Sequence, residues 1–223
     1  MGNKQLQSLW IHNMHIFFLT TGGTIDKDYP HATGGWAFEF GDEAAVARIL
    51  RERLAFPKPS FTHEIIETCR KDSLEITNED REALWKTIVK CQLKQQEIAA
   101  ADSSEQESRR SSTFDYGFVI THGTDTMLET GKYLQQQIEA RVTKELPPPS
   151  IVVTGAMRPE RFANSDAPIN LGMAVAAVQM MVASGKASGS FESAPGCHVH
   201  VAMHGIVKPV HFMQRDNQTG RFY

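Results

Sequence analysis

The stretch Met14–Thr24, MHIFFLTTGGT, decides the fold. Its first part, Met14–Thr20, is mostly apolar, and the run stops at the consecutive glycines Gly22 and Gly23. A short apolar run that ends in glycine is typical of a strand buried on both faces, as found in the middle of a parallel sheet. We therefore expect a central strand over Met14–Thr20 and a polar loop directly after it.

Strand and helix patterns alternate along the rest of the chain. Apolar runs bounded by turn residues predict further strands over Phe61–Thr68, Phe114–Thr121, Ser150–Thr154 and His198–Met203. Periodic apolar positions predict helices over Asp42–Leu54, from a capping box at Thr77–Asp80 through Leu93, over Asp125–Arg141 and over Asn170–Ala183. This alternation implies an α/β fold, a doubly wound and mainly parallel sheet flanked by helices in a Rossmann- or flavodoxin-like three-layer single domain. Two segments without apolar periodicity, Ala101–Thr113 and Ser184–Pro195, are expected to be surface loops.

Composition narrows the class of partner. The chain has 223 residues, 41% hydrophobic and 22% charged, which is ordinary for a globular domain. A net charge of −3 supplies no basic field, so we expect no nucleic-acid partner. Three widely spaced cysteines form no paired framework, and no apolar run near the N-terminus is long enough for a signal or a membrane span. We therefore expect a cytoplasmic protein with no membrane partner.

Polar residues gather where the predicted strands end. Four clusters follow the first four strands, at Thr20–Thr24, Lys71–Ser73, Thr121–Thr126 and Thr154–Arg158. In an open parallel sheet, ligands bind beyond the carboxyl ends of the strands, so these clusters converge on one edge. Hydroxyls at Thr24, Ser73 and Thr124 beside the carboxylate of Asp125 suit nucleophilic attack on a carbonyl, with nearby backbone N–H groups to stabilise an oxyanion.

Other interpretations fit some of the same residues. A Gly-Gly-Thr loop alone is a common strand-to-helix turn, and here it lacks the spacing of dinucleotide- and phosphate-binding loops. Asp125 also fits a helix N-cap, which is compatible with a chemical role. His122 fits a packing or hydrogen-bonding residue. His198 and His200 share a strand face but have no acid or cysteine at ligand spacing, so we expect no metal and no cofactor.

Three motifs in order carry a resemblance to a known family. They are TGGTI at Thr21–Ile25, HGTDT at His122–Thr126 and TGAMRP at Thr154–Pro159, and together they resemble the bacterial-type L-asparaginase/glutaminase family. The likeness continues through Asp166–Leu171 and Met203–Phe222, and it is greatest to short members with only the catalytic domain. It implies an N-terminal extension over residues 1–13 and an asparaginase N-terminal-type catalytic domain over 14–223.

The resemblance also implies roles for individual residues. Thr24 corresponds to the nucleophile, Tyr29 to its neighbouring tyrosine, and Thr124 and Asp125 to the second catalytic threonine and the aspartate of its triad. Arg215 stands where the family has a catalytic lysine. The implied substrate-binding residues are Gly23, Asp72, Ser73, Gly123 and Ala156. Leu74 stands where several long members have a glutamine that contacts substrate, and the smaller second domain of those members has no counterpart in this sequence.

The expected activity is an amidohydrolase that converts L-asparagine to L-aspartate and ammonia through a threonine acyl-enzyme. Arg215 and Leu74 favour a first alternative, a weakly active or inactive member that binds an amino acid without turnover. A second alternative is a hydrolase of another small amide such as glutamine. A small-molecule amide is therefore the expected partner. A homodimer or higher homo-oligomer is expected as well, because relatives bury helix faces between subunits.

Overall fold

The computed structural model describes residues 14–28, 39–54, 58–103, 115–141, 146–186 and 196–223. Within these residues the main sheet has six strands in the order β4-β1-β5-β6-β7-β8. Their bounds are Phe61–Lys71 for β4, Met14–Gly22 for β1, Asp115–Thr121 for β5, Ile151–Thr154 for β6, Val199–Met203 for β7 and Ile206–Pro209 for β8. The five expected strands are all present, and each is parallel to its neighbours among them.

The edge strand β8 was not predicted, and it runs antiparallel to β7. The antiparallel direction follows from the turn between the two strands. His204 has φ of 53° and Gly205 has φ of 85°, so both central residues lie in the left-handed region that tight hairpin turns require. A two-residue turn leaves no room for a crossover, and the chain folds straight back. The sheet is therefore mixed, with five parallel strands and one antiparallel edge.

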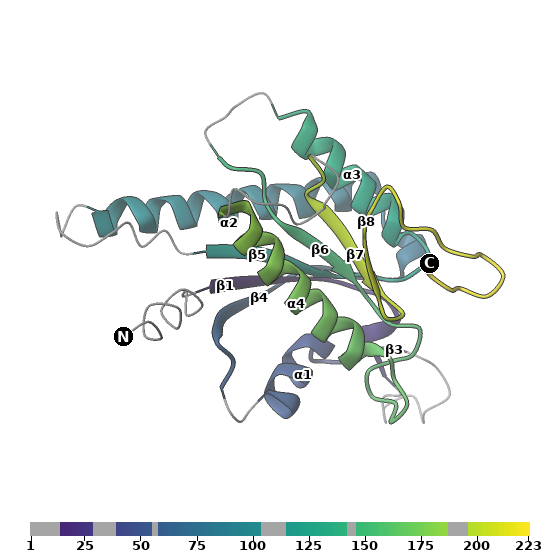
Figure 1. The fold of residues 1–223 in the computed structure, drawn as a ribbon. Helices are drawn as coiled ribbons and strands as arrows, with labels where there is room; N and C mark the ends of the chain where they lie inside the picture. The colour runs from purple at the N-terminus through teal and green to yellow at the C-terminus, as the bar shows by residue number, and fades with distance from the viewer. Residues whose placement is uncertain (1–13, 29–38, 55–57, 104–114, 142–145, 187–195) are drawn as a thin grey trace, which may run out of the picture.

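Four helices cover the two faces of the sheet in the described residues. Their bounds are Ala45–Arg53 for α1, Asn78–Ser103 for α2, Met127–Glu139 for α3 and Ala167–Lys186 for α4. Helices α2 and α3 lie on one face, and α1 and α4 lie on the other (Figure 1). Alternate residues of β1 enter opposite cores, since Phe17 packs beneath α2 and α3 while Phe18 packs against α1 and α4. This is the predicted three-layer α/β arrangement.

The boundaries of α1, α3 and α4 differ from the predicted ones by one to three residues, whereas α2 continues ten residues beyond Leu93. The capping box before α2 forms as predicted, with the Asp80 N–H donating to Thr77 Oγ1 at 3.3 Å and the Thr77 N–H donating to Asp80 Oδ2 at 2.8 Å. Helix α2 continues to Ser103 and α4 to Lys186, so the first residues of both predicted loops are helical. The rest of those loops, together with residues 1–13, lies outside the described residues.

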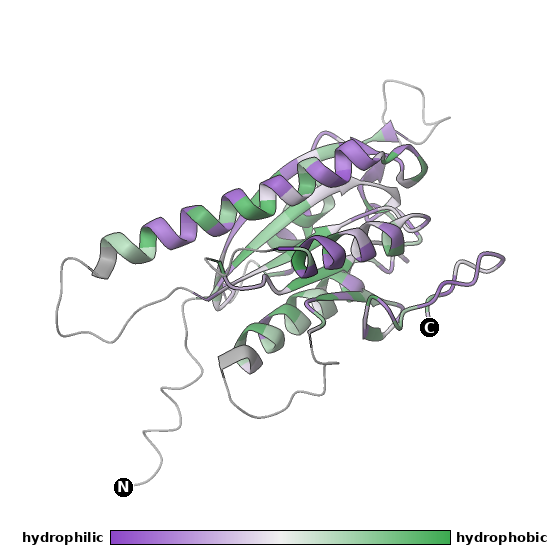
Figure 2. Cartoon of the chain, turned by 90° about the horizontal axis from the view of Figure 1, so that it is seen from above, coloured by the Kyte–Doolittle hydropathy of each residue, from purple (hydrophilic) through white to green (hydrophobic). Residues whose placement is uncertain are grey.

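Helix α4 is apolar along nearly all of its length (Figure 2). Within the described residues, its window Ala167–Ser184 has a mean hydropathy of 1.4, and no other helix is long and apolar enough to cross a membrane. One side of α4 packs on β5, β6 and β7 in the core that it shares with α1, which is the usual place of an apolar helix in a doubly wound fold. Its other side carries exposed apolar residues, including Ile169 at 67% and Met180 at 50% exposure.

The strand order creates a switch point between β1 and β5. From β1 the chain crosses to β4 at one edge, and it then returns to the opposite side of β1 to form β5. The loops that leave β1 and β5 therefore diverge, and the crevice between them is the usual ligand position in such sheets. The segments after these two strands contain Thr24 and Thr124.

Candidate active site

Three backbone segments meet at the carboxyl edge of the sheet. A Cβ added at Gly23 would lie 2.4 Å from the Cα and N of Gly123, and a Cβ added at Gly123 would lie 2.6 Å from the Cβ of Ser73. Gly23 also has φ of 84°, which favours glycine. Glycine at both positions thus allows the ends of β1 and β5 and the start of the segment after β4 to touch. The structure brings these three predicted clusters together.

Thr24 and Thr124 each follow a glycine of this contact. Thr24 begins a short 3-10 helix, Thr24–Asp26, and is half-buried, whereas Thr124 is buried at 6% exposure. Neither hydroxyl makes a hydrogen bond to another residue in the described part of the chain. Both hydroxyls are therefore uncommitted among these residues. Tyr29, the third residue expected here, lies outside the described residues.

Asp125 is held between two partners and does not cap a helix. Ser73 Oγ lies 3.1 Å from Asp125 Oδ2 and also accepts a hydrogen bond from the Asp125 N–H at 3.2 Å. Arg215 Nη2 donates to Asp125 Oδ1 at 2.8 Å. The N-cap of α3 is Thr126, which makes no side-chain cap and donates instead to the Ser73 carbonyl at 2.6 Å. The N-cap interpretation of Asp125 was therefore wrong, and its carboxylate contacts Ser73 and Arg215 instead of the end of helix α3.

Arg215 reaches Asp125 from the end of the chain. It lies on an antiparallel pairing in which Gln214 exchanges two backbone hydrogen bonds with Tyr223, both at 3.0 Å, and Arg215 pairs with Phe222. Phe222 is buried in the core beneath α2 and α3 and fixes this pairing to the domain. The Arg215 side chain is 15% exposed, and Nη1 donates to Asn217 at 3.3 Å. The guanidinium is thus held beside the carboxylate by the fold.

The two remaining expected pocket residues differ in how they are engaged. Ala156 is buried at 1% exposure after β6, and the loop that follows it is held by Asp166, which accepts from the Met157 and Arg158 N–H groups at 3.0 and 3.1 Å. Asp72 forms an ion pair with Lys27 at 2.7 Å and is about half exposed. Asp72 therefore links the segment of Thr24 to the segment of Ser73.

Asp26 anchors the base of the segment that carries Thr24. Its Oδ1 accepts from the Ala45 N–H at 2.6 Å, at the start of α1, and its carbonyl accepts from the Gly41 N–H at 3.0 Å. Burial raises the pKa of Asp26 to about 6, although the Ala45 hydrogen bond and the Arg48 charge oppose this shift. The helix N-terminus next to the carboxyl group favours its charged form.

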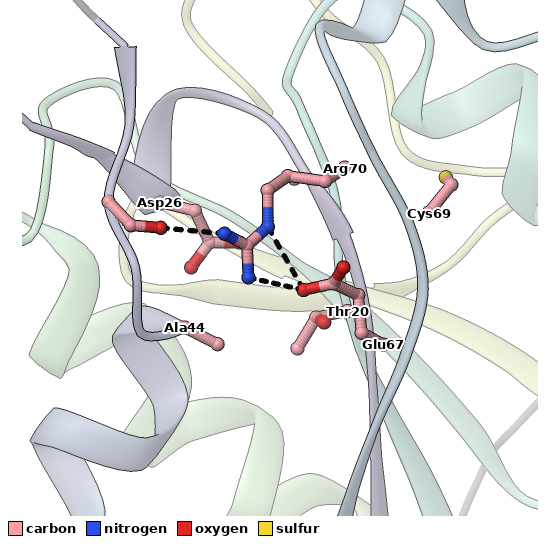
Figure 3. A pocket seen from close by; sticks show the side chains of 8 residues that line it. Thr20, Asp26, Ala44, Glu67, Cys69 and Arg70 are labelled. Atoms are coloured by element: carbon pink, nitrogen blue, oxygen red, sulfur yellow. Dashed lines mark hydrogen bonds and ion pairs between the residues drawn. The ribbon is translucent and has the colours of Figure 1, made fainter.

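Side chains around a narrow crevice beside Asp26 hold the neighbouring segments together (Figure 3). Arg70 extends across it from β4, donating to the Gly41 carbonyl at 2.8 Å and to Glu67 Oε2 at 3.0 Å. A second tie lies nearby, where the buried Arg48 donates to Glu160 Oε2 at 2.7 Å. The Glu160 N–H in turn donates to the Ile25 carbonyl at 3.2 Å. These contacts join the Thr24 turn to α1, to β4 and to the loop after Ala156.

Several of these supporting residues were not singled out as site residues from the sequence. Asp26, Asp166 and the fully buried Asn170 act on loop backbones, and Asn170 donates to the Gly155 carbonyl at 3.0 Å while accepting from the His204 N–H. Asp166 and Asn170 belong to the segment DAPINL that contributed to the family resemblance, so a signal for their importance was present. Nothing in the pattern around Asp26 marks it as buried.

Comparison with known proteins shows the family of this chain. A family model described as asparaginase, N-terminal, matches residues 15–189. A probable periplasmic L-asparaginase of Haemophilus influenzae is 44% identical over 73 residues, which cover 33% of this chain and 18% of that protein. One of the subunits of the glutamyl-tRNA(Gln) amidotransferase of Methanococcus vannielii is 26% identical over 193 residues, which cover 86% of this chain and 35% of that protein.

A solved structure is similar over most of this chain. The probable cytoplasmic L-asparaginase from Campylobacter jejuni superposes with a TM-score of 0.55 at 24% identity, covering 91% of this chain and 49% of that one. This structural similarity supports the assigned α/β fold. The chain spans about half the length of that asparaginase and a smaller share of the two curated relatives.

The fold and the site together define a doubly wound α/β protein with threonine hydroxyls and a carboxylate at its switch point. The expected family is confirmed by the match over most of the chain. The chain belongs to the asparaginase family and carries the N-terminal domain of that family.

Proposed function

We propose that this domain hydrolyses the side-chain amide of L-asparagine to give L-aspartate and ammonia. The observation that carries the proposal is the arrangement around Asp125. The Asp125 carboxylate is hydrogen-bonded to Ser73 and ion-paired to Arg215. Asp125 directly follows Thr124, and the glycines that precede Thr24 and Thr124 touch each other. A pair of hydroxyls with an oriented carboxylate is what covalent attack on an amide carbonyl requires.

In the proposed mechanism Thr24 is the nucleophile. Its Oγ attacks the amide carbon and forms the C–O bond, its proton passes through the relay to the amide nitrogen, and the C–N bond breaks so that the nitrogen leaves as ammonia. A water molecule, activated in the same way, then attacks the threonyl ester and releases aspartate. Thr124 and Asp125 relay protons and hold the reacting groups, and Arg215 orients the Asp125 carboxylate. Tyr29 is proposed to assist Thr24, as its counterpart does in the family.

The substrate is proposed to lie against the three touching segments. Without substrate the buried Ser73 hydroxyl donates to Asp125 Oδ2, and we propose that it turns to donate to the α-carboxylate of the amino acid when the substrate binds. Gly23 and Gly123 are proposed to line the substrate site, where the missing side chains let their backbones touch each other and Ser73, and the buried Ala156 is proposed to line it as well. Asp72 is proposed to contribute through its ion pair with Lys27, which ties the segment of Thr24 to the segment of Ser73.

Ammonia release from a panel of asparagine, glutamine and simple amides at millimolar concentration tests the proposal. We expect asparagine to be the preferred substrate. Thr24→Val and Thr124→Val should each lower kcat by about 100-fold or more, because each removes a reacting hydroxyl while keeping its shape. Thr87→Val, on helix α2 away from the site, is the matched control and should leave kcat unchanged. Equal activity in the parent and both site variants would contradict the proposal.

Arg215 favours a second candidate function, an amino-acid-binding protein that does not turn over its ligand. A guanidinium keeps its proton in proteins, and so it cannot act as the base that a lysine could become. In that case asparagine or aspartate should raise the melting temperature while no ammonia is released. The same panel, read by thermal shift as well as by ammonia, separates the two functions.

We also propose that the protein self-associates through α4 and that it works in the cytoplasm. The solvent side of α4 exposes Ile169 and Met180 about three turns apart, with mostly small or apolar residues between them. An exposed apolar stripe of this kind is unusual on a monomer. Light scattering at micromolar concentration should give a dimer or larger species, and the double change Ile169→Lys and Met180→Lys should give a monomer. A parent that is already monomeric would contradict this proposal.

A further inference from the structure

His122 is a buried titratable group that the proposed mechanism does not use. It lies between β5 and Gly123, and it is fully buried. Its Nδ1 lies 2.8 Å from the Gly123 carbonyl oxygen, and its Nε2 lies 2.9 Å from Thr130 Oγ1. Both ring nitrogens therefore have a partner, one on the backbone of the site and one on helix α3.

The partners determine where the protons are. Arg81 is a donor at every nitrogen, and its Nε donates to Thr130 Oγ1 at 3.1 Å. The Gly123 carbonyl can only accept, so His122 Nδ1 must carry a hydrogen. With Nδ1 protonated in a neutral ring, Nε2 is an acceptor, and the Thr130 hydroxyl donates its one hydrogen to it. The hydrogen bonds thus run in one direction, from Arg81 to Thr130, from Thr130 to His122 and from His122 to Gly123, and each group has a partner of the right kind.

The surroundings keep the ring neutral. Burial lowers the pKa of His122 to about 4, and although the Gly123 hydrogen bond opposes this shift, the Arg81 charge adds to it. Arg81 is itself fixed by Asn78 at 3.1 Å and by Glu129 at 3.2 Å. The ring is therefore an uncharged donor with a single tautomer.

The hydrogen bond to Gly123 has a consequence for Thr124. The peptide bond between these residues is planar, and in the trans form its C=O and N–H point in opposite directions. Holding the Gly123 carbonyl toward His122 therefore directs the Thr124 N–H away from His122. Within the described residues nothing accepts from that N–H. Gly123 also lies between the Ser73 side chain and Gly23, so a rotated peptide would disturb the contact that brings the threonines together.

We propose that His122 is a positioning residue, which as the Nδ1–H tautomer fixes the Gly123–Thr124 peptide plane and so holds Thr124 in register with Thr24. Arg81 and Thr130 select that tautomer from the far side of the ring. The proposal rests on the proposed function in one respect, because it assigns the fixed peptide to amide hydrolysis. It extends that function to residues that do not touch the substrate.

Substitutions of His122 by amide side chains can test its hydrogen bonds to Gly123 and to Thr130 one at a time. An asparagine at position 122 places its NH₂ group near the place of Nδ1, and a glutamine places it near that of Nε2. His122→Asn should therefore keep kcat for asparagine within about threefold of the parent, whereas His122→Gln and His122→Phe should lower it by about 10- to 100-fold with KM little changed. His211→Asn, an exposed histidine on another loop, is the matched control.

Nitrogen-15 NMR of histidine-labelled protein supplies a readout that needs no activity. We expect one ring in the Nδ1–H tautomer whose signals do not titrate between about pH 5 and 9 and are lost in His122→Asn. The Gly123 carbonyl ¹³C shift should be similar in the parent and in His122→Asn but moved in His122→Phe. An Nε2–H or charged ring, or a folded His122→Phe with full kcat, would overturn the proposal. If the parent releases no ammonia from any amide, the proposed function fails, and the NMR results still decide the tautomer and the peptide orientation.

Discussion

Replacing Arg215 with lysine is expected to raise kcat for asparagine by about tenfold or more. In the parent, Arg215 Nη2 lies 2.8 Å from Asp125 Oδ1, and Nη1 lies 3.3 Å from Asn217. A guanidinium in this place can orient the carboxylate, but it does not accept the proton that the threonine loses. A lysine amine that is largely shielded from water, as the Arg215 side chain is, loses its proton more readily because of burial, while the Asp125 carboxylate favours the charged form, and the neutral fraction can take part in the relay.

The expected change in kcat depends on the general base that lysine adds and on the hydrogen bond to Asn217 that is lost. General base catalysis contributes about 100- to 10,000-fold in favourable cases. The lysine should recover a part of this, because it has a single nitrogen and loses the contact with Asn217. A tenfold gain corresponds to about 1.4 kcal/mol of transition-state stabilisation. Arg215→Met, which keeps the stem but leaves Asp125 without a cation, should instead lower kcat.

Steady-state ammonia release over a range of pH values is the assay. The lysine variant should gain activity most at alkaline pH, where the amine is more often unprotonated, and Arg221→Lys on the same exposed hairpin should behave as the parent. The contradicting result would be a parent that already releases ammonia at about 10 per second, a typical enzyme rate, and an Arg215→Lys variant with equal or lower kcat. That result would show that the arginine is itself the functional group and that the relay reasoning is wrong.

Three further changes test the site and its supports. Ser73→Ala should raise KM for asparagine by about tenfold with kcat within about threefold, and a fall in kcat alone would mean that Ser73 acts only by orienting Asp125. Burial raises the pKa of Asp26 from its ordinary 3.8 to about 6, so the unfolded state ionises first and stability should fall by about 2–3 kcal/mol as pH rises from about 4 to 6. Asp26→Asn should remove that fall in urea unfolding at both pH values, and an unchanged pH dependence would refute the assignment. Gly23→Ala should abolish activity and lower the melting temperature, because its Cβ would meet the facing glycine backbone at 2.4 Å, while Gly172→Ala, with nothing within 4 Å, should be neutral or stabilising.

Most of the fold could be predicted from the sequence because the buried strands are apolar on both faces. The run around Phe17 and Phe18 supplies residues to both cores, and no other element type explains such a short apolar segment between glycines and polar residues. The edge strand β8 and the short pair β2 (Lys27–Asp28) and β3 (Glu39–Phe40) were not predicted. They are two to four residues long and largely unburied, so they have neither the length nor the hydrophobicity of a recognisable strand.

The site could be predicted in part for a similar reason. Polar residues directly after parallel strands must share one edge, and so Thr24, Ser73 and Thr124 could be grouped before the structure was known. Hydrogen bonds between distant residues leave no local pattern, and Arg215 was expected in the site only because the family resemblance aligns it with a catalytic lysine. Asp125 and Arg215 are 90 positions apart, and the Asp125 carboxylate suited a helix cap equally well until the Ser73 contact was seen.

The closely packed glycines have a consequence for anyone who wishes to redesign the pocket. At Gly23, Gly123 and Gly155 an added methyl group would approach a neighbour to within 2.3–2.6 Å, and for Gly23 and Gly155 the nearest atoms belong to backbone. These positions should be left out of combinatorial libraries, because almost every member would be unable to fold. Leu74 and Met157 offer a better starting point, since they directly follow Ser73 and Ala156 in the sequence and are 79% and 37% exposed. Changes in substrate preference should therefore be sought at these exposed positions, while the closely packed glycines are kept.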